Sequence, residues 1–222
     1  MKNTILFLLL AALSYGQNNQ PNPGTTPNYE FGFNLYSITD LKSALYRMTG
    51  EKYYIYDQNF FSGLFVKRHF NKNIIRASFD YTKKIINQET ITLHSYTEDN
   101  GEVNRGELRL GYERELSSKI VVPFVCADLG YSYSEAKGKE IVYGDFVSYA
   151  DRPYMIKTNW YFVNAGAGFK IKITKSVLLT YECGVQYGHY YSRDHSNPNI
   201  RETSAKFSSF NPVKSLGLSF RF

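Results

Sequence analysis

Hydrophobic and polar residues alternate with a period of two over eight separate stretches of the chain. This alternation predicts β-strands, because successive side chains of a strand point to opposite faces. In the clearest stretch, Leu129 and Tyr131 share one face, and Asp128 and Gly130 share the other. The stretch 60–70 has two mixed faces, and only Leu64 and Val66 favour one of them as the apolar face. The predicted strands are 29–37, 60–70, 74–84, 105–116, 120–134, 158–173, 177–191 and 210–222.

The connections between these strands alternate in length. Tight polar turns are predicted at 71–73, 117–119 and 174–176, and long polar loops at 38–59, 86–104, 135–157 and 192–209. In an antiparallel meander this places every tight turn at one end and every long loop at the other. Most of the strands exceed the roughly 9–11 residues of a tilted membrane crossing. We therefore predict an all-β, eight-stranded antiparallel up-and-down transmembrane β-barrel, closed by pairing of the last strand with the first.

The N-terminus, MKNTILFLLLAALSYGQ, has the order of a secretory signal peptide. Lys2 provides the positive region, 5–13 the apolar region, and Ser14 to Gly16 the small residues before cleavage. The apolar run is about half the length of a spanning helix. We predict a signal peptide at 1–16, a disordered periplasmic lead-in at 17–28 and the barrel at 29–222. Export also argues against a nucleic-acid partner.

The C-terminus ends in the pattern polar-x-Gly-x-x-aromatic-x-aromatic, formed by Ser215, Gly217, Phe220 and Phe222. This pattern resembles the β-signal that the outer-membrane barrel assembly machinery recognises. With the signal peptide and the loop pattern, the chain resembles the small outer-membrane β-barrel family of the eight-stranded OmpX/OmpA-barrel kind, of Gram-negative type. The resemblance implies a location in the outer membrane and the assembly machinery as a partner during biogenesis. Because this family shares form more than function, the resemblance implies no activity.

The mean hydropathy of −0.38 is that of a soluble protein, but aromatic residues reach 17%. A hydropathy average does not detect a membrane barrel, because every second residue faces its polar interior. The alternative is a soluble lipocalin-like carrier with an apolar inside. The barrel prediction assigns ten residues to the lipid-facing side: Phe31, Phe33, Phe79, Leu108, Leu110, Leu129, Val163, Leu179, Leu216 and Leu218.

The opposite face carries charges of both signs in near balance. Eight strands leave an interior only wide enough for side chains to fill, so we predict a plug of mutually paired charges. Inward glycines would either make room for a channel or ligand cavity, or let neighbouring Tyr or Arg side chains pack against backbone. The predicted lumen charge network is Glu30, Arg76, Asp80, Glu107, Arg109, Glu113, Asp128, Lys170, Glu182 and Arg221.

The two cysteines are predicted to be free thiols. Cys126 lies on the inward face of its strand and Cys183 on the outward face of a strand two positions away. That separation of about 10 Å exceeds the limit of about 7 Å between the Cα atoms of a disulfide.

Only one segment offers candidate catalytic or metal-binding chemistry. His189, Asp194 and His195 cluster in GHYYSRDHS (188–196), at the rim of the last long loop. Some small barrels are lipid A deacylases, but the His-x-Ser pairing typical of them is absent, because His189 and Ser192 point to opposite faces. We therefore predict a solvated loop, with no enzyme activity, metal or cofactor.

The net charge of +6 favours attraction to anionic lipopolysaccharide and outer-membrane lipid. The leading functional hypothesis is a structural or surface-interaction barrel, whose long extracellular loops contact a surface or envelope protein partner. The alternatives are a small pore or transport accessory (porin-like), and a lipid hydrolase acting at the barrel rim.

Overall fold

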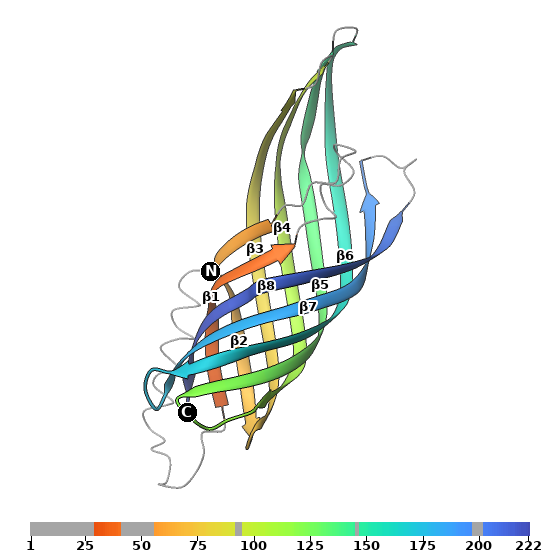
Figure 1. Cartoon of the computed structure of the whole chain (residues 1–222). Helices are drawn as coiled ribbons and strands as arrows, with labels where there is room; N and C mark the ends of the chain where they lie inside the picture. The colour runs from red at the N-terminus through yellow and green to blue at the C-terminus, as the bar shows by residue number, and fades with distance from the viewer. Residues whose placement is uncertain (1–28, 41–55, 92–94, 145–146, 197–201) are drawn as a thin grey trace.

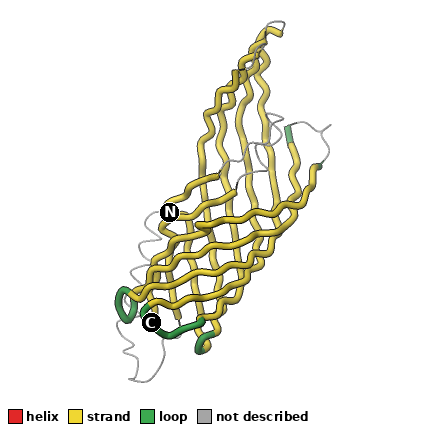
Figure 2. The backbone as a smooth tube through the Cα atoms, in the orientation of Figure 1, coloured by secondary structure: helices red, strands yellow, loops and turns green. Residues whose placement is uncertain are grey.

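The computed structural model describes residues 29–40, 56–91, 95–144, 147–196 and 202–222, so the predicted signal peptide and lead-in lie outside the described residues. These residues form eight antiparallel strands in one closed barrel, in which each strand pairs with its neighbours along the chain and β1 pairs with β8 (Figures 1 and 2). The predicted fold class is confirmed. The strands are β1 (Tyr29–Asp40), β2 (Tyr56–Phe70), β3 (Asn73–Ile91), β4 (Ser95–Glu115), β5 (Val121–Gly144), β6 (Val147–Lys172), β7 (Val177–Asp194) and β8 (Thr203–Arg221).

The strands are staggered as they pass around the barrel. Following paired residues from Tyr131 of β5 through β4, β3, β2, β1, β8, β7 and β6 leads back to β5 at Val121. A stagger of this size tilts the strands against the barrel axis, and closure leaves the lower wall without a free edge. The described residues include no helix long and apolar enough to cross a membrane.

The tight turns lie together at one end of the barrel, here called the turn end. Loop residues connect β2 to β3 at 71–72, β4 to β5 at 116–120 and β6 to β7 at 173–176, and the C-terminus lies beside them at the base of Figure 1. The predicted turns and their common end are confirmed.

The prediction of long loops at 86–104 and 135–157 is wrong for most of their length, whereas 41–55 and 197–201 of the other two predicted loops lie outside the described residues. The segments 86–104 and 135–157 are mainly strand, because β3 and β4 are separated only by 92–94, and β5 and β6 only by 145–146. These four strands rise well beyond the other four as a protruding sheet (Figure 1). Its backbone groups pair along the ladders, as at Lys84↔Val103 and Ala136↔Ile156, and its β-branched residues favour this extended form. The segments 38–59 and 192–209 also contain strand at both ends.

Three adjacent strands break their register at a similar position along the wall. The breaks lie beside Leu35 in β1, beside Phe61 in β2 and between Asn211 and Ser215 in β8. Phe61 has φ of 52°, a left-handed conformation that is unusual for a bulky residue and marks the bulge. The regular alternation predicted through 29–37 is therefore interrupted at Leu35. In β8, the irregularity turns Lys214 inward, where it is buried.

The barrel wall is apolar on the outside. All ten residues assigned to the lipid-facing side lie on the outward face, and Leu108, Leu110 and Leu129 are more than half exposed. Exposed aromatic residues lie both near the turn end and at the level where the protruding sheet begins, as the girdles of membrane barrels do. The lower girdle includes Tyr29, Phe70, Tyr112 and Phe222, and the upper girdle includes Tyr81, Tyr131, Tyr133, Tyr161, Tyr187 and Phe210.

Replacing Leu110 by Arg places a charge in the middle of the apolar wall. We expect the free energy of unfolding from lipid vesicles to fall by about 2–4 kcal/mol, measured by urea titration. The control is Ile85→Arg, an exposed outward residue on β3 above the upper girdle, which should change it by no more than about 0.5 kcal/mol. Equal effects of the two substitutions would show that the wall does not face hydrocarbon.

Candidate functional site

The interior of the barrel is filled with ion pairs. All ten residues of the predicted lumen network point inward, and Lys67, Arg105, Glu115 and Lys214 join them, which gives seven carboxylates and seven cations. The pairs form three layers, each with equal numbers of both signs. The lower group lies near the turn end, the central group above it, and the upper group near the protruding sheet. Each layer is electrically neutral, so no charge is buried without a partner.

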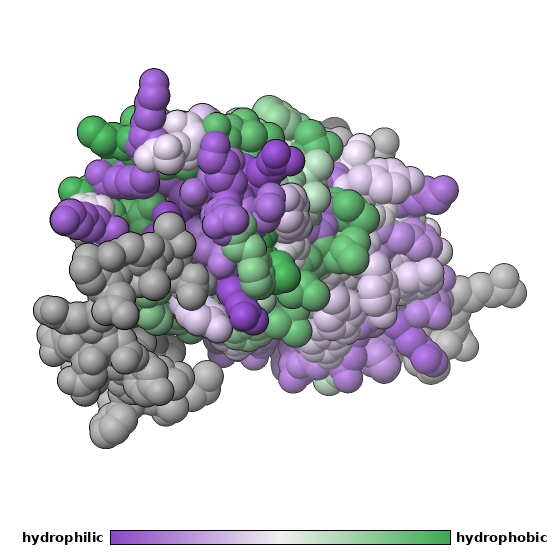
Figure 3. All heavy atoms as spheres, turned by 90° about the horizontal axis from the view of Figure 1, so that it is seen from below, coloured by the Kyte–Doolittle hydropathy of each residue, from purple (hydrophilic) through white to green (hydrophobic). Residues whose placement is uncertain are grey.

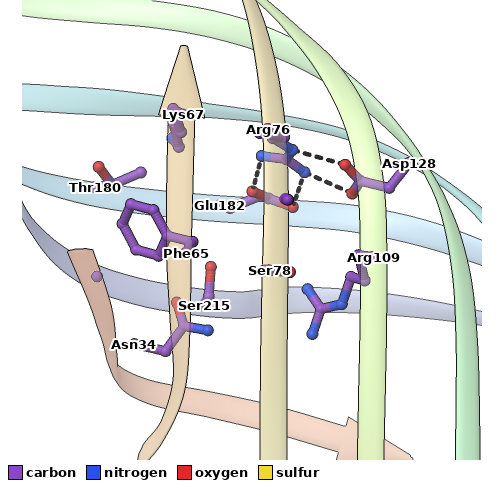
Figure 4. A pocket seen from close by; sticks show the side chains of 12 residues that line it. Asn34, Phe65, Lys67, Arg76, Ser78, Arg109, Asp128, Thr180, Glu182 and Ser215 are labelled. Carbon is purple, nitrogen blue, oxygen red and sulfur yellow. Dashed lines mark hydrogen bonds and ion pairs between the residues drawn. The ribbon is translucent and has the colours of Figure 1, made fainter. Parts of the chain in front are cut away.

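The central group consists of Arg76, Asp128 and Glu182, which are labelled in Figure 4, and of Lys214. The Arg76 guanidinium donates two hydrogen bonds of 2.6 Å to the Asp128 carboxylate and two, of 2.7 and 3.1 Å, to the Glu182 carboxylate. The Lys214 ammonium lies 2.9 Å from Glu182 and 3.2 Å from Asp128. This geometry matches the planar fork of arginine and joins β3 to β5 and β7 across the barrel.

The lower group consists of Glu30, Lys67, Glu113, Glu115, Lys170 and Arg221. Glu30 is fully buried and contacts Lys67, Lys170 and Arg221 at 3.1–3.6 Å. The His69 ring also lies 3.1 Å from Glu30. The Glu30–Arg221 pair joins β1 to β8, so this group stabilises the seam at which the barrel closes.

The upper group is a chain of four side chains. Arg109 contacts Asp80 at 3.0 Å and Glu107 at 2.5 Å, and Arg105 contacts Glu107 at 2.8 Å. The Arg105 guanidinium also lies 5.3 Å from the centre of the buried Trp160 ring. Trp160 in turn packs against Tyr190 and Phe207. Aromatic packing therefore covers this layer where the protruding sheet begins.

Inward phenylalanines fill space beside the charged side chains. Phe124 is buried and lies 5.7 Å from both the Lys67 and the Lys170 ammonium groups, an arrangement that cation–π attraction favours. A Cβ atom at Gly168 would lie 2.6 Å from the Phe124 ring, so only glycine leaves room for it. The inward glycines of the lumen thus accommodate filling side chains, mainly Phe and Asp, and the expected packing of Tyr against glycine occurs in the protruding sheet, where Tyr154 lies against Gly101 and Gly138. The cavity shown in Figure 4, lined by Arg76, Thr180 and Glu182 among others, has a volume of only about 40 Å³.

The protruding sheet carries paired charges on its outward side. The Lys83 ammonium lies 2.6 Å from Glu102, and Glu135 lies 2.5 Å from Lys137 and 3.7 Å from Lys157. The hydrogen bond from Lys83 holds the pKa of Glu102 below its ordinary value of 4.5, and the same bond raises the pKa of Lys83. On the opposite side of the sheet, buried apolar residues follow the inward rows of the barrel: Val103, Ala136 and Ile156.

The weak catalytic candidates do not form a constellation. His189 packs edge-on against Tyr191, while the Asp194 carboxylate accepts a hydrogen bond from the Ser196 backbone. None of the contacts in the described part of the chain joins the side chains of His189, Asp194 and His195. Ser192 is buried and accepts a hydrogen bond from Thr158. Among the described residues, no group of three or more His, Cys, Asp and Glu side chains is arranged to hold a metal ion.

The cysteine predictions agree with the structure. Cys126 is a buried free thiol and Cys183 a free thiol on the outer side, where its Sγ lies 3.3 Å from the Ala167 carbonyl.

Four charged lumen residues were not in the predicted network. Arg105 and Glu115 have the inward parity of Glu107 and Glu113, so a longer inward row on β4 would have included them. Lys67 lies on the strand with mixed faces. The weak preference of Leu64 and Val66 for the outward face already implied that Lys67, one residue further along, points inward. Lys214 has no such signal, because its inward position depends on the register break in β8.

The comparisons with known proteins find similarity of fold alone. No protein-family model and no curated protein matches the chain. Ail, the attachment invasion locus protein of Yersinia pestis, is similar at 13% identity in its complex with the heparin analogue sucrose octasulfate, over 88% of this chain and 97% of Ail, with a TM-score of 0.41. Ail without that ligand is similar at 12% identity, over 89% of this chain and 100% of Ail, with a TM-score of 0.42. A major outer membrane protein from Thermus thermophilus is similar at 10% identity, over 87% of this chain and 99% of that protein, with a TM-score of 0.48.

The architecture agrees with the resemblance to small outer-membrane β-barrels that the sequence indicated. It has eight antiparallel strands in a ring, short turns at one end and an apolar outside around a charged inside. The resemblance is therefore confirmed at the level of the fold.

Replacing Arg76 by Met removes the cation between Asp128 and Glu182. We expect the free energy of unfolding to fall by about 3–5 kcal/mol in lipid vesicles, because two carboxylates stay buried with one cation fewer. The control, Lys83→Gln, breaks an ion pair in water and should leave the urea midpoint unchanged. An Arg76→Met protein as stable as the original would contradict a stabilising role of the central group.

The carboxyl of Glu102 should titrate below pH 4.5, and Lys83→Gln should return its titration toward the ordinary range. The pKa of Glu102 is lowered in the folded sheet. The Lys83–Glu102 ion pair is therefore complete above the ordinary pKa of a glutamate carboxyl, and it is lost as the pH falls through the lowered pKa. Carbon-detected NMR of the Glu102 carboxyl group measures this. Lys157→Gln, which removes a contact of Glu135 instead, is the control and should leave Glu102 unchanged.

Proposed function

We propose that the protein is an integral outer-membrane barrel that does not conduct, and that it holds a rigid sheet above the membrane for contact with the cell surface or its surroundings. The observation that carries this proposal is the filled lumen, whose three neutral layers leave a cavity of only about 40 Å³. A continuous aqueous path would need many more waters than this volume holds. The location in the outer membrane is supported by the apolar wall, the aromatic girdles and the predicted signal peptide.

The protruding sheet is the part of the molecule best suited to contact a partner. Among the described residues, the ladders of Tyr81–Ile91 in β3 run only to β4, and those of 147–154 in β6 run only to β5. Each of these segments therefore has one edge that joins no β-ladder with another described strand. Unpaired edges can bind an extended segment of a partner by adding a strand to the sheet. The ion pairs on the outward side make the sheet soluble without making it flexible.

The first ligand that the base of this sheet would meet is lipopolysaccharide. Lys83, Lys137 and Lys157 lie above the upper girdle, at the depth where the phosphates and acidic sugars of that lipid begin. These three lysines pair with only two carboxylates, those of Glu102 and Glu135, so the group carries one excess positive charge. This favours an anionic surrounding over a neutral one.

Planar bilayer recording tests the closed lumen. The refolded protein, which should fractionate with outer membranes and show heat-modifiable gel mobility, is expected to give a flat current baseline. Arg76→Met should give at most brief, irregular openings, since the central group is only one of three closed layers. Steady conductance steps of the unmodified protein would contradict this proposal and favour the porin-like alternative.

A further inference from the structure

The turn end of the barrel contains an open, bowl-shaped cavity of about 490 Å³. Its wall comes from the three tight turns, and its floor is the lower group of the lumen. Figure 3 views the molecule from this end and shows hydrophilic residues gathered there beside the hydrophobic wall. The lining residues are His69, Asn71, Lys72, Glu115, Ser117, Ser118, Lys172, Lys175 and Arg221.

The charge of this bowl is strongly unbalanced, unlike that of the lumen above it. Four of its lining residues are Lys or Arg, and Glu115 is its one carboxylate. That carboxylate is already engaged by Lys170 at 2.9 Å and by Arg221 at 2.7 Å. Lys72 and Lys175 are exposed in the turns, and no ion pair to either is found among the described residues. The positive field of the bowl is therefore not neutralised from within.

The floor of the bowl adds a fixed cation. The Nε atom of Arg221 is buried and has no hydrogen-bond partner among the described residues, although its NH2 group contacts Glu30 and Glu115. The His69 side chain is also held, by its contact with Glu30. Hydroxyl groups of Ser117 and Ser118 stand at the wall. The Lys172 ammonium donates one hydrogen bond to the Ser118 carbonyl at 2.8 Å and has further N–H donors. Ammonium, guanidinium and hydroxyl groups together are suitable donors for phosphate oxygens.

We propose that this bowl binds phosphate groups on the periplasmic side of the barrel. A phosphate would take charge-assisted hydrogen bonds from Lys72, Lys172 and Lys175, close to Arg221. Two sources offer this chemistry, a water-soluble phosphate ester and the headgroup of an anionic phospholipid in the adjacent leaflet. The proposal rests on the membrane location given in the proposed function, but not on the closed lumen or the protruding sheet. Failure of pyrophosphate binding would therefore leave a flat current baseline in bilayer recording unchanged, and the two proposals can fail separately.

Titration calorimetry with inorganic pyrophosphate tests the bowl, using the full chain folded in neutral detergent at constant ionic strength. We expect saturable binding, weakened about fivefold to tenfold by Lys72→Gln with Lys175→Gln. The matched control is Arg114→Gln with Lys119→Gln, two exposed cations at the same end that do not line the bowl. Each variant should first show heat-modifiable mobility, and the control should bind as the original does.

Nanodiscs separate the two sources. If phosphatidylglycerol headgroups enter the bowl, pyrophosphate should bind more weakly in nanodiscs that contain this lipid than in phosphatidylcholine nanodiscs, and the double Lys72/Lys175 variant should show a smaller difference. Equal binding in both nanodiscs identifies a water-soluble ligand instead. The proposal is overturned if pyrophosphate does not saturate in neutral detergent, or if the control variant loses as much affinity as the Lys72/Lys175 variant.

Discussion

Charge neutrality inside a closed wall is the constraint on which this structure depends. Fourteen ionised side chains occupy a space too narrow for bulk water, and a single uncompensated ion there would cost several kcal/mol. The charges are balanced within each of the three layers, and not only over all fourteen side chains together. Arg76 is central to it, because its five N–H donors satisfy two carboxylates at once. Arg76 also lies 3.4 Å from Glu113, so the central and lower groups are in contact with each other.

The same network determines how the barrel is held shut. Backbone ladders close the wall, but they do so equally well in any register that keeps the faces in phase. The side chains of the lower group add a specific choice, because Glu30 of β1 meets Arg221 of β8 only in the observed pairing. Glu30 also meets Lys67 of β2 and Lys170 of β6. One buried carboxylate therefore connects the first strand to three others, including the last.

The sequence predicted the faces of the strands well and their ends poorly. Period-two alternation is imposed by the wall itself, so Leu110 and Arg109 had to face opposite ways, and the ten charged residues assigned to the inside point inward in the structure. The alternation fades above the upper girdle, where both faces of a strand can be polar, and residues such as Glu102 and Lys137 were therefore predicted to lie in loops. Lys214 was missed for another reason, because a bulge shifts the phase of β8 and only the partner strand reveals it. The bowl at the turn end was missed because its members come from turns and strand ends far apart in the chain.

Because the eight strands have unequal heights, the molecule has two different flanks in the plane of the membrane. A barrel with a level rim is nearly the same from every side, so its neighbours in a crowded bilayer would meet it without preference. Here β3 to β6 continue upward on one flank, while β1, β2, β7 and β8 end lower on the other (Figure 1). Among the described residues, a molecule that approaches along the surface therefore meets the protruding sheet on one flank and the lower ends of the other four strands on the other. If copies of this protein packed side by side in the membrane, the flanks in contact would determine whether the protruding sheets of neighbouring copies stand apart or form one continuous row.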